Sequence, residues 1–516
     1  MERRDRASEV VLDGGPLALE AVSAVARGGA RVALAPAAVA TVDAARAFVD
    51  RLAGSDDPVY GITTGVGKLK DVVIPASERA ALQRNLVLSH AGGVGAPLAV
   101  DETRAVMLLL AASLARGASG VRSRVVDTVV RCLNASVHPV VPEQGSVGSS
   151  GDLAPLAHVA ACLIGEGEAW VDGKRVPARD ALAGAGIEPL SLETKEGLAL
   201  LNGTHLMAGL GALAVLDATE LARLADVTGA MSLEALMGSN AAFEERIHRL
   251  RPHPGQLTVA ANLRALTEAS AIIASHADCT RVQDAYSLRC MPQVHGAARE
   301  AIAFARTVLE RELASVTDNP LVFPDDGVVR SGGNFHGEIV GTALDTLAIG
   351  LAQLGGIAER RIDRLLNPLT NEGLPAFLAS DRGLNSGYMI AQYVAASLVS
   401  ELKLAAHPAS VDSIPTSGLQ EDYNAMAGAS ALKLRRAVGL ARQVVAIELL
   451  VAAQALDLRL PLTAGRGTAA AREAVRLRIP TLGADRYLKA DLDAALALVL
   501  DGTVLGAAER AAGELG

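Results

Sequence analysis

The segment from Glu143 to His158 places small residues in an order that can support unusual backbone chemistry. It reads EQGSVGSSGDLAPLAH, with Ser149, Ser150 and Gly151 at its centre. If the chain bends tightly there, the amide nitrogen of Gly151 can reach the carbonyl carbon of Ser149, because glycine has no Cβ to crowd the approach. Cyclisation with loss of two waters, one of them from the Ser150 hydroxyl, would leave an electrophilic methylidene at Ser150. The simpler interpretation of this composition is a flexible Gly/Ser turn.

Two other motifs that could indicate a binding or catalytic site are incomplete. A phosphate-binding loop around Gly65 to Lys68 would need glycine at Ile62 and Ser or Thr at Leu69, so the pattern fails at two positions. The ten histidines show no HExxH motif and no paired metal-ligand spacing. We therefore expect neither a nucleotide site of this type nor a catalytic metal.

The composition excludes several classes of protein. Half of the residues are hydrophobic, so the chain has enough apolar surface to fold and is not expected to be disordered. The net charge is −9, with no basic run, which disfavours a nucleic-acid binder. Four cysteines without CxxC pairing, and a start (MERRDRASEV) without an apolar region, predict a cytoplasmic protein with reduced thiols.

Long segments rich in Ala and Leu predict the helices that must position the glycine-rich loops. Helix boundary residues place them at Asp101 to Gly117, His295 to Ser315, Gly337 to Leu366, and Ala429 to about Leu456. Alternation typical of strands is confined to short pieces such as Trp170 to Val176. Helices this long and apolar can bury themselves only against one another, which predicts a multi-helix bundle with a large helix–helix interface.

One apolar segment is long enough to be mistaken for a membrane span. Gly197 to Leu216 contains no Asp, Glu, Lys or Arg. Its interior holds Asn202, Thr204 and His205, whose polar groups a bilayer would leave without partners. We therefore expect a buried segment of a soluble core rather than contact with a membrane.

The order of motifs along the chain resembles the aromatic amino acid ammonia-lyase and aminomutase family, and within it most closely the histidine ammonia-lyases. The resemblance extends from about Leu12 to the segment IPTLGADRY at 479–487. It rests on YGITTG at 60–65, the loop around Ser149, EGLALLNGT at 196–204, QDAYSLR at 283–289, NFHG at 334–337 and QED at 420–422. Six long motifs in one order do not arise by chance.

The resemblance implies a fold, a cofactor and an assembly. The fold is expected to be mainly α, a large multi-helix bundle of the ammonia-lyase (fumarase/aspartase-like) type with a loop-rich N-terminal portion. We expect one catalytic unit in which residues 1–200 carry the Tyr60 and Ser149 loops, 201–460 form the central long helices, and 461–516 form a C-terminal helical segment. Ser149, Ser150 and Gly151 are expected to form the methylidene-imidazolone group (MIO) autocatalytically. The assembly is expected to be a homotetramer with active sites shared between subunits.

The family's functional positions match residues of this sequence. Tyr60 is similar to the general base, although a phenol is mostly protonated at neutral pH and the site must favour the phenolate. Arg289 resembles the clamp for the substrate carboxylate, because a guanidinium binds carboxylates in a bidentate way. The other matching positions in these motifs, which the resemblance places at the active site, are Gln283, Tyr286, Asn202 (bonded to the MIO or the substrate carboxylate) and Phe335 (beside the MIO). Without the resemblance, Tyr60 would be taken for an ordinary packed ring.

Specificity is expected to depend on His90 and Glu421. His90 follows Leu88 and Ser89 in a segment similar to that of histidine lyases, but a histidine can bond either an imidazole or a phenol. Glu421 matches the glutamate that faces the imidazole in histidine lyases. A desolvated carboxylate is costly beside a ring without a donor, whereas an imidazole N–H would satisfy it. The alternative for Glu421 is a solvated loop acid beside Asp422.

Several positions depart from the family's pattern. The MIO tripeptide usually begins with Ala, whereas this chain has Ser149, whose side chain should remain as a ring substituent. The other departures are Thr63, Val66, His205 in place of a usual Gln, His295 in place of a common apolar residue, and the run from Tyr423 to Ala425. They leave the chemistry in place and bear on the identity of the substrate.

Taken together, the sequence predicts a cytoplasmic, MIO-dependent lyase that converts L-histidine to trans-urocanate and ammonia. One alternative is an ammonia-lyase or 2,3-aminomutase acting on tyrosine, phenylalanine or another amino acid. A second is a relative without turnover that keeps only the fold, against which the presence of Tyr60, Ser150, Gly151 and Arg289 argues.

Overall fold

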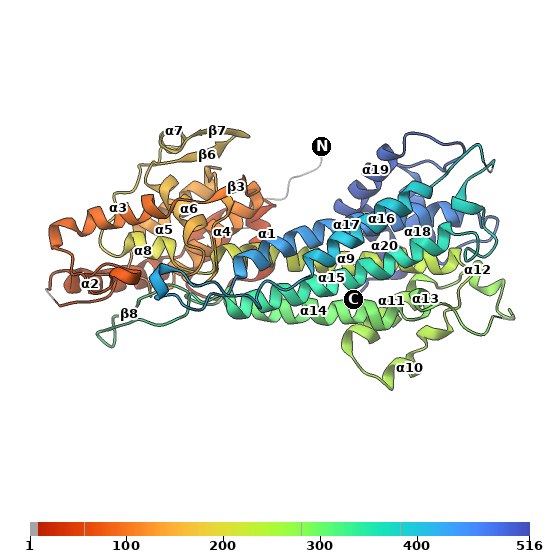
Figure 1. Cartoon of the computed structure of the whole chain (residues 1–516), viewed down its shortest axis with the longest axis horizontal. Helices are drawn as coiled ribbons and strands as arrows, with labels where there is room; N and C mark the ends of the chain where they lie inside the picture. Colours follow the sequence, from red (N-terminus) through yellow and green to blue (C-terminus); the bar gives the residue numbers. More distant parts are fainter. Residues whose placement is uncertain (1–8, 56, 280, 382) are drawn as a thin grey trace. The chain divides into compact units, whose positions relative to one another are not determined.

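The protein is mainly α-helical, as expected. The computed structural model describes residues 9–55, 57–279, 281–381 and 383–516, and in these ranges it contains twenty α-helices and nine short β-strands (Figure 1). The first eight residues, on which part of the expected location rests, lie outside the described ranges. The chain divides into two compact units, each assembled from three separate segments of sequence. The expected division of the chain near residues 200 and 460 remains a prediction.

The first unit comprises Met1–Leu216, Ala305–Asp345 and Pro408–Leu432. Its shorter helices are α1 (Leu19–Ala26), α2 (Pro36–Ala53), α3 (Arg79–His90), α4 (Val100–Leu114), α5 (Ser123–Asn134), α6 (Leu153–Leu163), α7 (Ala178–Gly184) and α8 (Glu196–Leu201). Its strands are β1 (Val10–Leu12), β2 (Val32–Leu34), β3 (Val94–Pro97), β4 (His138–Pro139), β5 (Pro142–Gln144), β6 (Glu168–Val171), β7 (Lys174–Pro177), β8 (Leu321–Phe323) and β9 (Val328–Arg330). They form one parallel pair, β1–β2, and three small antiparallel sheets, β3–β5, β4–β6–β7 and β8–β9.

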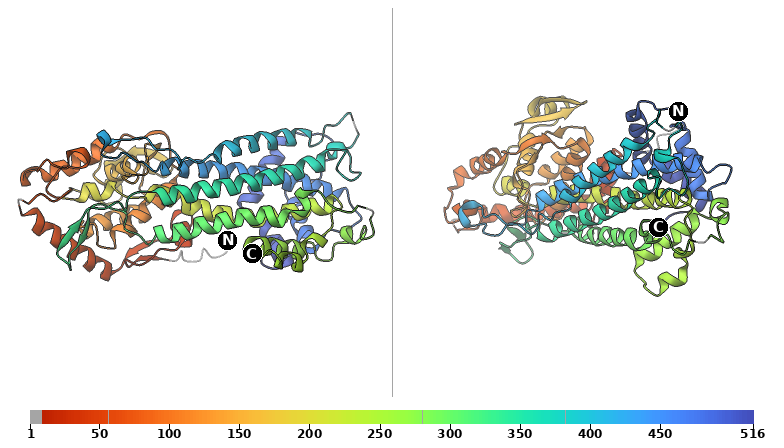
Figure 2. Two further views of the ribbon diagram at one scale, coloured as in Figure 1. Left: turned by 60° about the horizontal axis from the view of Figure 1, so that its bottom comes forward. Right: turned by 45° about the vertical axis from the view of Figure 1, so that its right-hand side comes forward.

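The second unit comprises Asp217–Phe304, Thr346–His407 and Lys433–Gly516. Its shorter helices are α10 (Glu245–Arg249), α11 (Pro254–Leu266), α12 (Ala271–Ala274), α13 (Tyr286–Arg289), α16 (Met389–Ala405), α18 (Arg466–Arg476), α19 (Leu488–Leu500) and α20 (Thr503–Ala512). No strand occurs among the described residues of this unit, which is built from helices and loops (Figure 2).

Four long helices run through the sequence: the last three lie close to where helices were expected, whereas the first overlaps the apolar segment that was expected only to be buried. They are α9 (His205–Ala235), α14 (Met291–Glu312), α15 (Glu338–Leu366) and α17 (Ala427–Asp457). Helices α9, α15 and α17 are long and apolar enough to cross a membrane, but 83%, 61% and 83% of their most apolar windows are buried within the protein. Burial inside the protein therefore accounts for much of their apolar character.

The apolar segment from Gly197 to Leu216 is not one helix. Helix α8 ends at Leu201, Asn202 adopts an extended conformation, and α9 begins at His205. The polar residues Asn202 and Thr204 thus lie in a break between two buried helices, with side chains 5% and 2% exposed. This break provides non-helical backbone inside the first unit.

A buried ion pair fixes the segment that leads into this break. The Lys195 ammonium lies 2.6 Å from the Asp318 carboxylate, and the two side chains are 0% and 2% exposed. Asp318 also accepts a hydrogen bond from the Asn319 amide (2.6 Å). The pair therefore joins the start of α8 to the loop that carries Asn319.

Removing one partner of this pair should destabilise the first unit strongly. We expect Lys195→Met to lower the free energy of unfolding by about 3–5 kcal/mol, because the Asp318 carboxylate would remain buried without its counter-ion. The double variant Lys195→Met/Asp318→Asn should recover part of that loss. Urea denaturation followed by circular dichroism measures both, with the exposed Lys174→Met as the matched control. A single variant as stable as Lys174→Met would contradict this role of the pair.

Candidate active site

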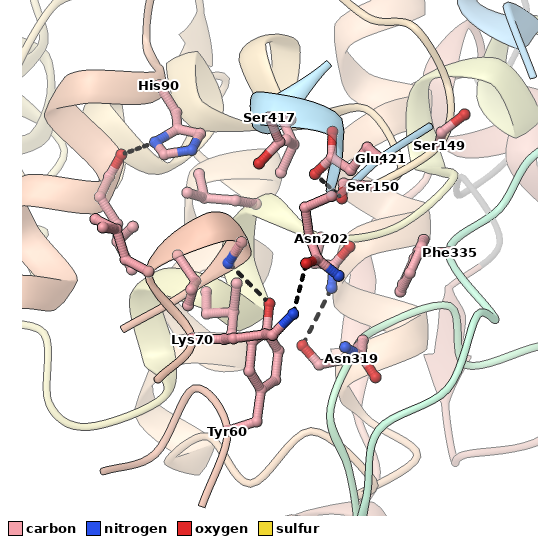
Figure 3. Close-up of a pocket in the computed structure, with 18 of the residues that line it drawn as sticks. Tyr60, Lys70, His90, Ser149, Ser150, Asn202, Asn319, Phe335, Ser417 and Glu421 are labelled. Carbon is pink, nitrogen blue, oxygen red and sulfur yellow. Dashed lines mark hydrogen bonds between the residues drawn. The ribbon is translucent and has the colours of Figure 1, made fainter. Parts of the chain in front are cut away.

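A cavity of about 870 Å³ in the first unit brings together most of the residues expected to carry chemistry (Figure 3). The expected residues that line it are Tyr60, His90, Ser149, Ser150, Asn202, Phe335 and Glu421. They come from separate parts of the sequence, so the fold and not local spacing assembles them. All described residues that line this cavity belong to the first unit.

The Ser149 loop is held by a close backbone approach to the break between α8 and α9. Gly151 and Gly203 form a parallel β-bridge, and the Asp152 amide donates to the Gly203 carbonyl (2.8 Å). Gly151 has φ +68°, and a Cβ atom added to it would overlap the backbone of Gly203. Only glycine fits position 151, both for its conformation and for the contact it makes. The segment is an ordered turn, in contrast to the flexible loop that its composition alone suggests.

Asp152 joins this turn to the start of α9. Its carboxylate is fully buried and accepts hydrogen bonds from the Ser146 hydroxyl (2.6 Å) and from the amides of Leu206 (2.9 Å) and Met207 (3.1 Å). Burial raises the pKa of Asp152 to about 6, against the lowering effect of these hydrogen bonds. The acid therefore satisfies amides at a helix N-terminus while it fixes the residue that follows Gly151.

The two serines of the loop have different surroundings. The Ser150 hydroxyl faces the cavity and donates to the Glu421 carboxylate at 3.0 Å (Figure 3). The buried Ser149 hydroxyl accepts a hydrogen bond from the Ala425 amide (2.6 Å). Ser149 thus has a partner for the hydroxyl that alanine would lack, which accommodates the departure from the family's usual tripeptide.

Glu421 is positioned by its own loop. The second oxygen of its carboxylate accepts from the Thr416 hydroxyl (2.6 Å), and Thr416 and Glu421 form an antiparallel bridge. The intervening turn contains η5 (Ser417–Leu419), where Gly418 has φ +58°. Glu421 is a half-buried residue of the cavity and not the solvated loop acid that was the alternative.

Tyr60 lies opposite this loop in a turn of its own. Its hydroxyl oxygen accepts a hydrogen bond from the Gly67 amide (3.2 Å), at the start of η1 (Gly67–Leu69). The Lys70 ammonium bonds the Gln420 side chain at 2.5 Å, so the Tyr60 loop and the Glu421 loop are tied together (Figure 3). A donor at the phenol oxygen and a cation among the lining residues both favour negative charge in this part of the cavity.

Asn202 lies beside the Ser150 loop, and within the described ranges only the NH₂ group of its side-chain amide has a hydrogen-bond partner. Its NH₂ group donates to the Asn319 carbonyl (3.1 Å). Its carbonyl oxygen is buried and has no hydrogen-bond partner among the described residues. A buried acceptor without a partner is costly, so this oxygen is available to a donor that enters the cavity.

His90 is the last residue of α3, and its hydrogen bonds define which ring nitrogen carries the hydrogen. Its Nδ1 lies 2.8 Å from the Leu86 carbonyl, which can only accept, so the hydrogen is on Nδ1. In the neutral ring, Nε2 is then an acceptor. His90 can therefore bind a ligand that presents an N–H or O–H group.

Gln283, Tyr286 and Arg289 form a separate cluster in the second unit. The Arg289 guanidinium donates to the Gln283 side chain (2.9 Å) and to the Asp284 carbonyl (3.0 Å), and lies 4.7 Å from the centre of the Tyr286 ring. Helix α13 spans only four residues, and Gln283 precedes it. None of the three is among the described residues that line the cavity.

Some lining residues were not predicted. Lys70 and Asn319 enter the cavity through contacts between segments far apart in the sequence, which no local pattern indicates. His336 lies in the NFHG motif and stacks on Tyr423, with ring centres 6.2 Å apart. Of the positions that depart from the family's pattern, Val66 and Tyr423 line the cavity, whereas Thr63 and His205 are buried outside its lining.

Among the described residues there is no group of three or more His, Cys, Asp or Glu that could hold a metal ion.

Comparisons with known proteins show the family to which the chain belongs. Residues 17–477 match the family model described as aromatic amino acid lyase. The chain is 53% identical over 502 residues to the histidine ammonia-lyase of Myxococcus xanthus (strain DK1622), which covers 97% of this chain and 99% of that relative. A second histidine ammonia-lyase, from Gloeobacter violaceus (strain ATCC 29082 / PCC 7421), is 54% identical over 98% of both chains.

Solved structures give the same result. The crystal structure of histidine ammonia-lyase from Trypanosoma cruzi is 44% identical, with a TM-score of 0.90 over 97% of this chain and 95% of that one. Tyrosine aminomutase from Streptomyces globisporus is 40% identical, with a TM-score of 0.92 over 98% of this chain and 99% of that one. The resemblance seen in the motifs is thereby confirmed: the chain belongs to the aromatic amino acid lyase family.

Proposed function

We propose that this protein is a cytoplasmic histidine ammonia-lyase that eliminates ammonia from L-histidine to give trans-urocanate. The observation that carries the proposal is the contact between the Ser150 hydroxyl and the Glu421 carboxylate, 3.0 Å apart in the cavity that Tyr60 and His90 also line. It places a residue suited to an imidazole N–H beside the tripeptide that can form an electrophile. The histidine ammonia-lyases that are 53% and 54% identical to this chain support the same substrate.

The residues around the tripeptide fit the MIO group. The tight turn that ring closure needs is favoured by the positive φ of Gly151 and by its backbone pairing with Gly203. In that closure the Gly151 nitrogen bonds to the Ser149 carbonyl carbon, whose oxygen leaves as water with the amide hydrogens of Gly151 and Ser150. Ser150 loses its hydroxyl and α-hydrogen as a second water. When present, the group supplies a methylidene that accepts electrons from the substrate's amine or ring. The free oxygen of Asn202 and the ring of Phe335 are the residues to border it.

Tyr60 is the residue proposed to remove the β-proton of the substrate. Elimination of ammonia requires a base for a poorly acidic C–H bond. The Gly67 amide that donates to the Tyr60 oxygen stabilises the phenolate, and the nearby Lys70 ammonium adds positive charge to the same cavity.

Glu421 and His90 are proposed to select the imidazole side chain. The Thr416 hydroxyl orients the Glu421 carboxylate, so that its other oxygen can accept an N–H from the substrate ring. His90 presents the acceptor Nε2 and can bind a second donor. A carboxylate desolvated against a phenyl ring would have no such donor, which disfavours phenylalanine.

Arg289, with Gln283 and Tyr286, is proposed to bind the substrate carboxylate as part of an active site shared between subunits of a homotetramer. Two observations support this assignment. The guanidinium is held by neighbours that leave it able to form further hydrogen bonds, and the Tyr286 side chain is 71% exposed in the isolated chain. Exposed apolar side chains on α16, such as Ile390 and Tyr393, are suited to burial between subunits.

A second candidate function is a tyrosine aminomutase. The structure of tyrosine aminomutase from Streptomyces globisporus is 40% identical to this chain, and a His90 side chain can bind a phenol as well as an imidazole. Glu421 favours histidine, because it matches the glutamate that faces the imidazole in histidine lyases, where relatives often have a neutral amide.

Replacing Ser150 tests the cofactor. The purified wild type should be lighter than its sequence mass by two waters, and Ser150→Ala should lose at most one water and nearly all activity, because no methylidene can form. Ser149→Ala is the matched control: its hydroxyl is not eliminated, so the loss of two waters and most of the activity should remain. Intact-protein mass spectrometry reads the result. A wild type at its full sequence mass, or an active Ser150→Ala variant, would rule out the proposed group.

A panel of amino acids with identified products tests the substrate. We expect L-histidine to be the best substrate and trans-urocanate, identified by mass and NMR, to be its product. A β-amino acid product, or a preference for tyrosine, would establish the second candidate instead.

The role of Glu421 can be measured in the same assay. Glu421→Gln should lower kcat/KM for L-histidine by about 10- to 100-fold, since a hydrogen bond to a charged group contributes about 1.5–3 kcal/mol. Any residual turnover of tyrosine serves as the internal control and should change less. An equal loss for both amino acids would assign Glu421 a structural role.

A further inference from the structure

A buried polar network lies in the second unit, and none of its members has a role in the proposed function. It consists of Asp226 on α9, His295 and Arg299 on α14, Arg361 on α15 and Glu448 on α17. Figure 1 labels these four helices. The side chains of Asp226, His295, Arg361 and Glu448 are 0% exposed, and that of Arg299 is 11% exposed. Charges this deeply buried are costly unless each has a partner, so the network's connections define what it can do.

His295 is the link between the two halves of this network. Its Nδ1 lies 2.7 Å from the Asp226 carboxylate, and its Nε2 lies 3.2 Å from Nη1 of Arg361. A guanidinium can only donate, so Nε2 is the acceptor and the hydrogen is on Nδ1, where it is donated to Asp226. The ring is therefore neutral, and both of its nitrogens are used.

Arg361 is fixed on its other side by Glu448. Its Nε and Nη2 donate to the two carboxylate oxygens at 2.5 Å and 3.0 Å, and these oxygens also accept from the hydroxyls of Ser232 and Thr228 (both 2.8 Å). Such a bidentate pair holds the guanidinium plane in one orientation. In that orientation Nη1 also donates to the Ser287 carbonyl at 3.4 Å. Ser287 is the second residue of α13 and lies two positions before Arg289.

Helix α13 depends on such outside contacts. A helix of four residues cannot hold itself in water. Its inner side is anchored by the buried Leu288. The chain is held next to it by Met291 at the start of α14, whose sulfur would lie only 2.6 Å from a Cβ added to Gly229 of α9. The Arg361 guanidinium supplies the hydrogen bond to the backbone of α13 on the same side. The outer side carries Tyr286 and Arg289.

We propose that His295 is a positioning residue for Arg289, acting through Arg361 and the Ser287 carbonyl to hold the guanidinium where it binds the substrate carboxylate. This inference rests on the carboxylate-binding role proposed for Arg289. It also assigns a role to His295, which stands at a position where the family commonly has an apolar residue. An apolar side chain there would remove the acceptor that His295 Nε2 offers to Arg361 Nη1 and the donor that its Nδ1 offers to Asp226.

The network also makes this positioning sensitive to acid. The charged groups facing His295 are Asp226 from α9, Arg299 from its own helix and Arg361 from α15, with Glu448 of α17 behind Arg361. With a neutral ring the two acids balance the two arginines. Burial, and to a lesser extent Arg361, lower the pKa of His295 below its usual value of 6.5, although Asp226 opposes them.

The sign of the pH effect follows from that direction. The unfolded chain binds a proton near pH 6.5 and the folded chain only at lower pH, so stability from this site is complete above that value and falls on acidification. Protonation places an N–H on Nε2 against the Arg361 N–H. The His295–Arg361 contact is therefore present at neutral pH and lost in acid.

Kinetics of His295→Asn test the proposal. The asparagine amide can replace the Nδ1 donor to Asp226 but offers no acceptor at the place of Nε2. We expect KM for L-histidine to rise about 10-fold, with kcat changed less than about 3-fold and the mass loss of two waters intact. Inhibition by histamine, which has the imidazole but lacks the carboxylate, should not change. His295→Gln, which can place an oxygen near Nε2, should restore KM, and the exposed His253→Asn is the control.

The outcomes separate this inference from the proposed function. A wild type without the mass loss or without turnover of L-histidine would refute the proposed function. A competent wild type, with His295→Asn unchanged in KM or weakened equally toward histamine and L-histidine, would overturn only the role of His295. If His295→Asn fails to fold, the wild type's pH profile decides. Affinity for L-histidine should fall in acid relative to affinity for histamine, and parallel profiles after correction for ligand titration would contradict the proposal.

Discussion

The structure of the candidate site depends on one close contact between two glycines. Gly151 and Gly203 pair through their backbones, and no side chain fits at position 151. Most of the other features either create this contact or use it. The break between α8 and α9 supplies the backbone of Gly203, Asp152 fastens the turn to the first residues of α9, and Ser150 is left facing the cavity. The buried pair of Lys195 and Asp318 holds the approach to the break from the other side.

Apolar and polar residues have different roles around the contact between Gly151 and Gly203. Aliphatic side chains form most of the buried surface of the long helices, which gives a rigid support at little cost in buried polar groups. The polar residues that line the cavity lie mainly in turns and at helix ends, where non-helical backbone needs partners. Asn202, Glu421 and Tyr60 all lie in such places, and their hydrogen bonds connect segments that are distant in sequence. The site is therefore a property of the helix ends, positioned by helices that take no part in the chemistry.

Much of this was predictable from the sequence, and the parts that were not have a physical reason. Helices α14, α15 and α17 were predicted because long Ala- and Leu-rich segments with boundary residues specify a helix locally. Arg289, Gln283 and Tyr286 were named together because they stand in one motif of the family that the sequence resembles. Lys70 was missed because its partner Gln420 is 350 positions away, and no local pattern reports such a contact. Asn319 was missed for the same reason, since a turn sequence does not say which cavity the turn will line.

The polar residues inside Gly197 to Leu216 predicted one feature of this segment and left another unpredicted. Asn202, Thr204 and His205 indicated that the segment is not a membrane span, and the structure places them at a break in a buried region. The sequence did not indicate that Gly203, between them, is the partner of Gly151. The most direct test of the account is an electron-density map of the wild-type enzyme at residues 149–151. The account predicts a closed five-membered ring with a planar methylidene at Ser150, packed on Gly203, and a linear Ser-Ser-Gly chain in active protein would contradict it.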